Sequence, residues 1–267
     1  MNTDLGIREI RQITNYLKEK YSIEYSDYAL TSFKRRVDGF LSSNRYGVDT
    51  LMKNLESRDF LDHFVGRIGV GDTELFRDPT FWILLKNNYI PSIFKEHLKA
   101  RIWLPVCSTG EEFYSLAILL KESGWTDKVE VYVSSMSNEA LQSMQNGCMD
   151  IEKLEISAKN YSRFQGTGQF TDYYKISNNT VMFNKSLFVH TKFFKDGLSF
   201  SYEIPYIHLI LFRNKMIYFN PTLQYKVCEA LHGKLAAKGL LALGILEEVE
   251  GKFYVLNKNE SVYQRKG

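Results

Sequence analysis

Residues 106–112, VCSTGEE, join a short loop of small residues to two acidic side chains. The stretch 101–106 (RIWLPV) before the loop reads as a strand, and 113–123 (FYSLAILLKES) after it reads as a helix. A glycine loop between a strand and a helix N-terminus commonly binds phosphate, because free N–H groups and the helix dipole attract anions. Glu111 and Glu112 would repel a phosphate, so the loop predicts a ligand that carries positive charge.

Two explanations of this loop remain open from the residues alone. Thr109 and Glu112 have the spacing of a capping box, in which both side chains satisfy N–H groups at a helix start. A capping box does not explain why the loop around Gly110 is built of small residues throughout, which permit close approach of a ligand. S-adenosyl-L-methionine suits both features, because it carries sulfonium and amino groups for carboxylates to neutralise and has no phosphate.

The composition narrows the function classes. The chain has 267 residues, 44% of them hydrophobic and 24% charged, which is typical of a folded, soluble protein. Its formal net charge of +3 is too small to indicate nucleic-acid binding, and its three scattered cysteines have no metal-ligand spacing. No signal peptide or bilayer-length apolar run is visible, so we expect a cytoplasmic protein without membrane insertion and without a metal. Nothing in the sequence requires more than a monomer.

Strands and helices alternate after about residue 100, which predicts an α/β domain with a parallel sheet. Besides the segments that flank the loop, the expected strands are 129–135, 208–212, 240–246 and 253–257, and the expected helices are 140–147 and 222–239. The last two strands are expected to form an antiparallel hairpin. Residues 150–190 show turn signals and no clear helical period, which predicts an insertion of short strands. Residues 1 to about 60 instead carry apolar side chains at helical spacing.

Three motifs in order carry a family resemblance: TELFRDPTFW (73–82), CSTGEE (107–112) and FRNKMIYF (212–219). They resemble the CheR family of chemotaxis receptor methyltransferases, whose motifs read T-x-F-F-R, C-S-T-G-E-E and C-R-N-V-M-I-Y-F. The resemblance implies a class I S-adenosylmethionine-dependent methyltransferase (Rossmann-like) α/β domain over 73–267, with a small inserted β-subdomain at 150–190. It also implies a preceding all-helical domain over 1–72.

The family transfers a methyl group from S-adenosyl-L-methionine to glutamate side chains of methyl-accepting chemoreceptors, and the product is S-adenosyl-L-homocysteine. A glutamate carboxylate is already nucleophilic at neutral pH, so the reaction needs no strong general base. The enzyme must hold the carboxylate oxygen, the methyl carbon and the sulfur in line and exclude water. Positioning of this kind contributes about 7–11 kcal/mol at best.

The resemblance also implies roles for single residues. Thr73 and Arg77 would contact the cofactor, with Arg77 also near the reacting groups. Glu112, in the loop with Gly110, would meet the positively charged methionine end of the cofactor. Arg213 and Asn214 would line the floor of the site, and Tyr218 would orient the substrate carboxylate. Taken singly, each has a plainer explanation, such as a surface ion pair of Arg77 with Asp78 or Glu74.

The sequence departs from the family in the cofactor pocket. The second strand of the family ends in T-D-I-D, whose first aspartate grips the ribose hydroxyls, whereas here Ser135 and Ser137 replace both acids. Losing a charge-assisted hydrogen bond costs about 1.5–3 kcal/mol, or roughly ten- to a hundredfold in affinity. Gly71 replaces an asparagine ahead of the first motif, Lys192 in FVHTKFFKDG aligns with another asparagine after the fourth strand, and His208 replaces an aspartate.

Three functions therefore remain open. The first is an active protein-glutamate O-methyltransferase with a remodelled pocket, which we favour because Arg77, Glu112, Asn214 and Tyr218 are kept. The second is a degenerate, inactive relative that serves as a binding or regulatory module. The third is an altered, more anionic ligand such as a nucleotide.

A basic cluster in the N-terminal half suggests a partner. Lys34, Arg35 and Arg36 are consecutive in an expected helix, and the corresponding family helix faces acidic receptor helices. The resemblance therefore implies a chemoreceptor or a similar helical signalling protein as partner, bound through these three residues. A solvated helix face is the alternative.

Overall fold

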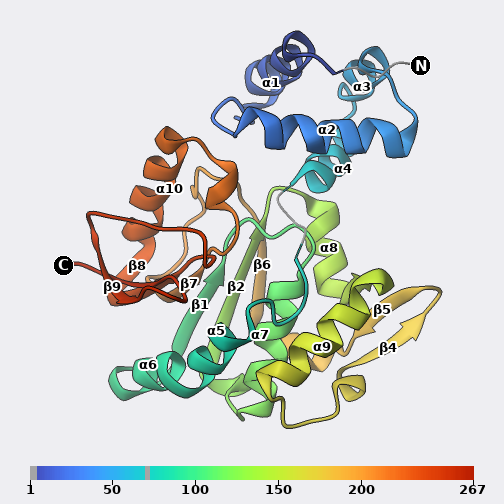
Figure 1. Cartoon of the computed structure of the whole chain (residues 1–267). Helices are drawn as coiled ribbons and strands as arrows, with labels where there is room; N and C mark the ends of the chain where they lie inside the picture. The colour runs from blue at the N-terminus through green and yellow to red at the C-terminus, as the bar shows by residue number, and fades with distance from the viewer. Residues whose placement is uncertain (1–4, 70–72) are drawn as a thin grey trace.

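The computed structural model describes residues 5–69 and 73–267, so Gly71 and its neighbour Asp72 lie outside the described residues. Four helices come first, and three of them stand above one end of a central sheet while α4 descends to it (Figure 1). Their bounds are α1 (Ile7–Tyr21), α2 (Leu30–Asn44), α3 (Val48–Asn54) and α4 (Arg58–Ile68). The helices predicted for this half are confirmed in the described part.

The central sheet has seven strands, and one of them, β10, runs in the opposite direction to the other six. In spatial order they are β6 (Thr191–Lys195), β2 (Val129–Ser135), β1 (Ala100–Leu104), β7 (Ile207–Leu211), β8 (Leu235–Ala242), β10 (Val262–Arg265) and β9 (Phe253–Asn257). The first five pair in parallel, and β10 pairs antiparallel with both β8 and β9. This order and the crossover helices confirm the predicted Rossmann-like α/β domain.

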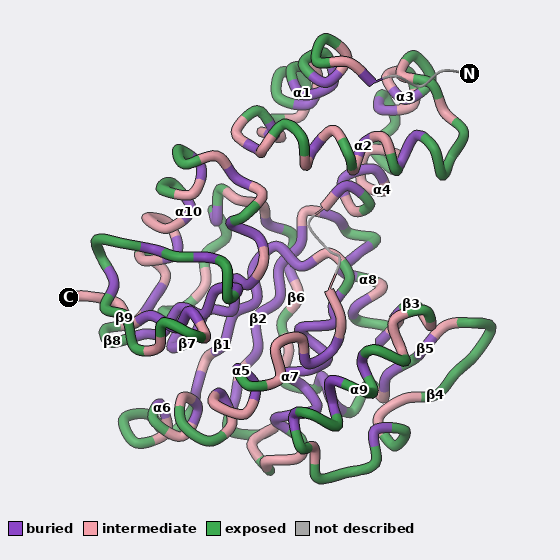
Figure 2. The backbone as a smooth tube through the Cα atoms, in the orientation of Figure 1, coloured by how far each residue is buried: buried purple, intermediate pink, exposed green. Residues whose placement is uncertain are grey.

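Side chains alternate between the two faces of the sheet and form a separate hydrophobic cluster on each. On β1, Ile102 and Leu104 belong to one cluster, and Trp103 belongs to the other. The first face is covered by α5 (Pro79–Leu84), a π-helical turn (Leu85–Tyr89), α6 (Ile90–Glu96), α7 (Glu111–Glu122) and α9 (Leu154–Phe164). The second cluster includes residues of α1–α4 and of α10 (Pro221–Lys234). Figure 2 shows β1 and β2 as buried between these layers.

The segment 150–190 holds short strands, as predicted, and also a helix that the sequence did not predict. The strands β3 (Cys148–Asp150), β5 (Thr180–Phe183) and β4 (Tyr174–Ser177) form a second, antiparallel sheet. Helix α9 buries four side chains at helical spacing, namely Ser157, Asn160, Tyr161 and Phe164. Two of these four are polar, which hid the period from a search for apolar residues.

Two expectations near the C-terminus are wrong. The helix expected over 222–239 ends at Lys234, because the chain from Leu235 pairs with β7 as the strand β8. Leucine, alanine and lysine favour a helix locally, and pairing with a buried strand overrides that weak preference. The expected hairpin between 240–246 and 253–257 does not form either, since β10 lies between β8 and β9. No helix in the described part of the chain is long and apolar enough to cross a membrane.

Candidate functional site

The loop 105–110 lies against the carboxyl end of the neighbouring strand β2. The Cys107 N–H donates to the Ser134 carbonyl over 2.7 Å, and the Val106 N–H donates to Ser134 Oγ over 3.3 Å. Parallel strands present their carboxyl ends at one edge of the sheet, where ligands of open α/β sheets bind. The loop is therefore held at the expected ligand-binding edge.

Gly110, rather than Thr109, caps helix α7. Its φ of 90° lies in the left-handed region, and a Cβ there would lie 2.7 Å from Met144 Cγ of α8 (Asn138–Asn146). The Thr109 hydroxyl donates to the Glu111 carboxylate, and α7 has no side-chain cap. The capping box between Thr109 and Glu112 is thus not formed, and Gly110 serves close packing of α7 against α8.

The two glutamates at the start of α7 are both buried and have different partners. Glu111 Oε1 lies 2.8 Å from Lys153 Nζ. Glu112 lies 3.7 Å from Arg213 NH1 and 3.7 Å from Lys215 Nζ. Burial raises the pKa of each carboxyl above its ordinary value, against the opposing effect of the nearby cations. Glu112 is therefore the glutamate that faces the third motif.

Arg213 joins the second and third motifs to the first. Its NH2 donates to Asp78 Oδ2 over 2.6 Å, its NH1 donates to the Arg77 carbonyl over 3.2 Å, and its guanidinium lies 4.1 Å from the centre of the Phe81 ring. The Arg213 side chain is only 2% exposed, and its Nε has no hydrogen-bond partner among the described residues. Asp78 therefore pairs with Arg213.

Side chains of two helices, α9 and α7, bind the backbone of the segment before Arg77. The Leu75 N–H donates to Ser157 Oγ over 3.2 Å, and the Phe76 N–H donates to Ser115 Oγ over 2.8 Å. Thr73 is partly buried at the start of this segment. The Arg77 carbonyl also accepts from Trp82 Nε1 over 2.9 Å. These bonds hold the first motif beside the start of α7.

Glu247 organises the third motif, and the sequence did not predict it. Its carboxylate accepts from the N–H groups of Asn214 over 2.8 Å, Gly244 over 2.7 Å and Ile217 over 3.1 Å. Glu247 is buried and follows β8, in the EEVEG stretch that reads as a simple connection. Asn214 has a φ of 58°, so the loop takes a strained left-handed conformation that Glu247 stabilises. The sequence carries no signal for this role, because the burial of Glu247 and its bonds to the loop appear only in the folded chain.

Tyr218 lies at the contact between the third motif and the N-terminal helices. The Arg36 guanidinium of α2 lies 4.3 Å from the centre of the Tyr218 ring. The Ala29 N–H donates to the Tyr218 carbonyl over 2.8 Å, and Tyr28 packs on Phe219 with ring centres 5.0 Å apart. Tyr218 is thus held by residues that precede it by more than 180 positions.

The basic cluster is not one patch. Arg35 is exposed and Lys34 partly exposed, whereas Arg36 turns inward and also donates to Ser32 Oγ over 3.2 Å and to the Ile68 carbonyl over 3.3 Å. Burial lowers the pKa of the Arg36 guanidinium from its ordinary value. The predicted grouping therefore separates into a surface pair and a residue at the candidate site.

At the end of β2, serines and an aspartate from α4 replace the two acids of the family. Ser135 Oγ is buried and accepts from the Ser137 N–H over 3.3 Å. Ser137 caps α8 and donates to Asp62 Oδ2 over 3.0 Å. Asp62 also accepts from two N–H groups of α8 and from Lys195 Nζ, the latter over 2.6 Å. Helix α4 comes so close that a Cβ on Gly66 would lie 2.8 Å from Ser137 Oγ.

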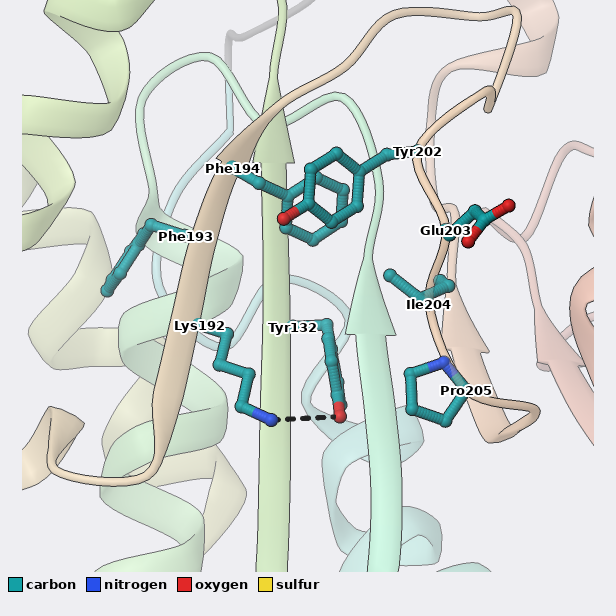
Figure 3. Close-up of a pocket in the computed structure, with 8 residues that line it drawn as sticks. All are labelled: Tyr132, Lys192, Phe193, Phe194, Tyr202, Glu203, Ile204 and Pro205. Carbon is teal, nitrogen blue, oxygen red and sulfur yellow. Dashed lines mark hydrogen bonds between the residues drawn. The ribbon is translucent and has the colours of Figure 1, made fainter.

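Two other departures lie away from the loop. Lys192 lies within β6, not after a strand, and its Nζ is 3.5 Å from the Tyr132 hydroxyl (Figure 3). Both line a pocket of about 430 Å³ on the side of the sheet. The prediction that Lys192 follows a strand at the ligand-binding edge is therefore wrong, because Lys192 lies within β6 beside Tyr132, in the middle of β2. His208 lies in β7 and its Nδ1 accepts from the Arg101 N–H over 2.9 Å.

The structure thus gathers most of the predicted side chains at one edge. Arg213 of the third motif contacts the Arg77 carbonyl of the first and Glu112 of the second. Asn214 follows Arg213 and donates to Glu247, and Tyr218 lies further along the same loop. Lys34 and Arg35 lie on the outer helix α2.

Comparisons with known proteins show the family of the chain. Residues 71–263 match the family model described as CheR methyltransferase, SAM binding domain. The chain is 28% identical to Cher3 of Pseudomonas putida over 258 residues, which cover 95% of this chain and 92% of that protein. It is 25% identical to a chemotaxis protein methyltransferase of Listeria innocua over 239 residues, 88% of each chain. Among solved structures, the N-methyltransferase NodS of Bradyrhizobium japonicum with S-adenosyl-L-homocysteine aligns over 73% of this chain and 70% of that chain, at 11% identity and a TM-score of 0.32. Because the family model spans most of its length, the chain belongs to the CheR family of S-adenosylmethionine-binding methyltransferases.

Proposed function

We propose that the chain transfers a methyl group from S-adenosyl-L-methionine to glutamate side chains of a chemoreceptor-type helical protein, and releases S-adenosyl-L-homocysteine. The observation that carries the proposal is the contact of Glu112 with Arg213, which joins the strand–loop–helix to the loop that bears Tyr218. The match to chemotaxis protein methyltransferases over most of both chains supports the substrate class.

The residues present fit the cofactor. Glu112 is a buried carboxylate whose two cationic neighbours lie at 3.7 Å, beyond hydrogen-bonding range, so its oxygens can accept from an ammonium group. Thr73, Arg77, Gly110, Ser135, Arg213 and Asn214 would line the rest of the site. The bound cofactor supplies an electrophilic methyl group. We propose no role for a metal.

The chain itself would supply orientation. Tyr218 would hold the substrate carboxylate through its hydroxyl, and Arg36, stacked on its ring, would fix the ring and add positive charge near an anionic substrate. A glutamate carboxylate is ionised at neutral pH, so no general base is needed. Helix α2 would thus serve both the acidic partner, through Lys34 and Arg35, and the reacting groups, through Arg36.

In this proposal, the two parts of the chain have different roles. Residues 1–72 would form the receptor-facing helical domain, and 73–267 the methyltransferase domain with its β-subdomain at 150–190. We propose that the protein acts as a monomer in the cytoplasm. The comparisons do not favour the alternative of an inactive binding module, since the relatives named as methyltransferases match over most of their length.

Calorimetry and a labelled-methyl assay test the proposal. The unsubstituted chain and a Ser135→Asp variant are titrated with S-adenosyl-L-methionine and S-adenosyl-L-homocysteine. Methyl transfer is then followed from radiolabelled cofactor to a receptor cytoplasmic fragment, and alkali is used to release the label as methanol. Micromolar binding with alkali-labile label supports a glutamyl methyl ester. No binding by the unsubstituted chain, with binding restored in Ser135→Asp, would contradict activity.

A further inference from the structure

Lys215 is a buried cation in the third motif, at the position where the family motif C-R-N-V-M-I-Y-F has valine. Its side chain is 8% exposed, its Nζ lies 3.7 Å from Glu112 Oε2, and it lies 5.3 Å from the centre of the Phe212 ring. A buried ammonium group is costly unless it is paired and hydrogen-bonded. A long ion pair with one shared carboxylate is weak compensation for such a group.

Lys215 is the less well compensated of the two cations beside Glu112. Arg213 also pairs with Asp78 over 2.6 Å, whereas Lys215 has Glu112 at 3.7 Å as its ion-pair partner among the described residues. Arg213 shares Glu112 with Lys215, and the buried Arg213 Nε has no hydrogen-bond partner among the described residues. An unsatisfied buried donor is destabilising, so its presence points to an acceptor that a ligand brings. The acceptor that two cations favour is an anion, and the carboxylate is the one that the proposed reactants carry.

We propose that Lys215 binds a ligand carboxylate beside Glu112, so that the pair presents opposite charges side by side. This inference rests on the proposed function. The carboxylate belongs either to the methionine end of the cofactor, whose ammonium then meets Glu112, or to the substrate glutamate. In both cases Lys215 sets specificity through a charge that the family motif lacks.

The test uses Lys215→Met, which keeps length and removes charge, beside Lys215→Arg, which keeps charge. Lys153→Met is the matched control, because Lys153 pairs with the neighbouring Glu111. Calorimetry measures the affinity of each variant for S-adenosyl-L-homocysteine and for its decarboxylated analogue, which retains the ammonium group. Methylation assays measure KM and kcat with a receptor fragment, and thermal unfolding checks that each variant folds.

If the cofactor supplies the carboxylate, Lys215→Met lowers the affinity for S-adenosyl-L-homocysteine about tenfold or more. The affinity for the decarboxylated analogue is unchanged. If the substrate supplies it, cofactor affinity is unchanged and KM for the receptor fragment rises by a similar factor. Lys215→Arg restores either value, and Lys153→Met changes neither.

Three results would overturn the inference alone: tighter cofactor binding in Lys215→Met, equal loss of both cofactor analogues, or no change in affinity and KM. Tighter binding would mean that Lys215 competes with the cofactor for Glu112. Failure of the unsubstituted chain to bind S-adenosyl-L-homocysteine would instead contradict the proposed function, and this inference with it.

Discussion

The Arg36 guanidinium stacks on the Tyr218 ring at 4.3 Å from its centre, and this contact joins helix α2 to the loop that closes the candidate site. Arg36 also donates to Ser32 and to the Ile68 carbonyl, so its position is fixed from both α2 and the end of α4. The N-terminal helices therefore contribute directly to the surroundings of Tyr218.

Arg36→Met is expected to lower kcat about tenfold while cofactor affinity stays unchanged, because a cation–π contact contributes roughly 0.5–2 kcal/mol and each 1.36 kcal/mol is tenfold in rate. Steady-state methylation with a receptor fragment and calorimetry with cofactor measure both values. Arg35→Met, at the exposed neighbour, should change mainly the salt dependence of partner binding. Equal effects of the two substitutions would argue against a separate role for Arg36.

Glu112→Gln is expected to lower the affinity for S-adenosyl-L-methionine by roughly ten- to a hundredfold, because a charge-assisted hydrogen bond is lost. Burial holds the pKa of Glu112 above its ordinary 4.5. Cofactor affinity should therefore fall as pH is lowered through that raised pKa, and the Gln variant should lose this dependence. Calorimetric titrations at several pH values give both curves.

The same raised pKa has the opposite consequence for stability. The folded chain binds this proton more tightly than the unfolded chain, so the contribution to stability is full at low pH and is lost as pH rises through the folded-state pKa. Urea unfolding of the unsubstituted chain and of Glu112→Gln should show the difference. A Gln variant with an unchanged pH profile of stability would show that this carboxyl titrates normally.

Asp62→Ala is expected to lower the free energy of unfolding by about 1–3 kcal/mol, since it removes the charged acceptor of the partly buried Ser137 hydroxyl and of two exposed N–H groups of α8. Burial raises the pKa of Asp62, but hydrogen bonds from Lys195 and α8 outweigh it and lower the pKa overall. Its stabilisation is thus present above the ordinary carboxyl pKa and is lost as pH falls through the lowered one. Hydrogen exchange in α4 and denaturant unfolding measure the loss, and Asp59→Ala on the same helix, at an exposed position, is the control.

His208 is expected to make the fold sensitive to mild acid. Burial lowers its pKa to about 4, so it is neutral at pH 7 and its Nδ1 accepts from the Arg101 N–H. Because the folded-state pKa is below the unfolded value of 6.5, this stabilisation is present above pH 6.5 and is lost between pH 6.5 and about 4. Thermal unfolding at pH 7 and pH 5 should show a larger drop for the unsubstituted chain than for His208→Asn, which keeps an acceptor. Equal drops would show that another group titrates.

Much of the α/β domain could be predicted because its signals are local. Strand β2 and strand β9 begin and end where the apolar pattern places them, and β1 and β7 lie within one or two residues of it. The apolar pattern does not predict helix α9, because its buried face is half polar. It predicts a helix over 235–239, the first part of β8, because local preference there favours a helix and only strand pairing overrides it.

The sequence by itself determined the family, the type of fold and the identity of the motif residues, since each of these depends on residue types in a short order along the chain. Only the tertiary structure decided which residues meet. Glu247, Asp62 and Arg36 carry no motif, and their importance follows from contacts with residues 30 to more than 180 positions away. It also separated Lys192 from the site and brought Lys215 to Glu112, because charge pairing depends on distance in space and not on position in the chain.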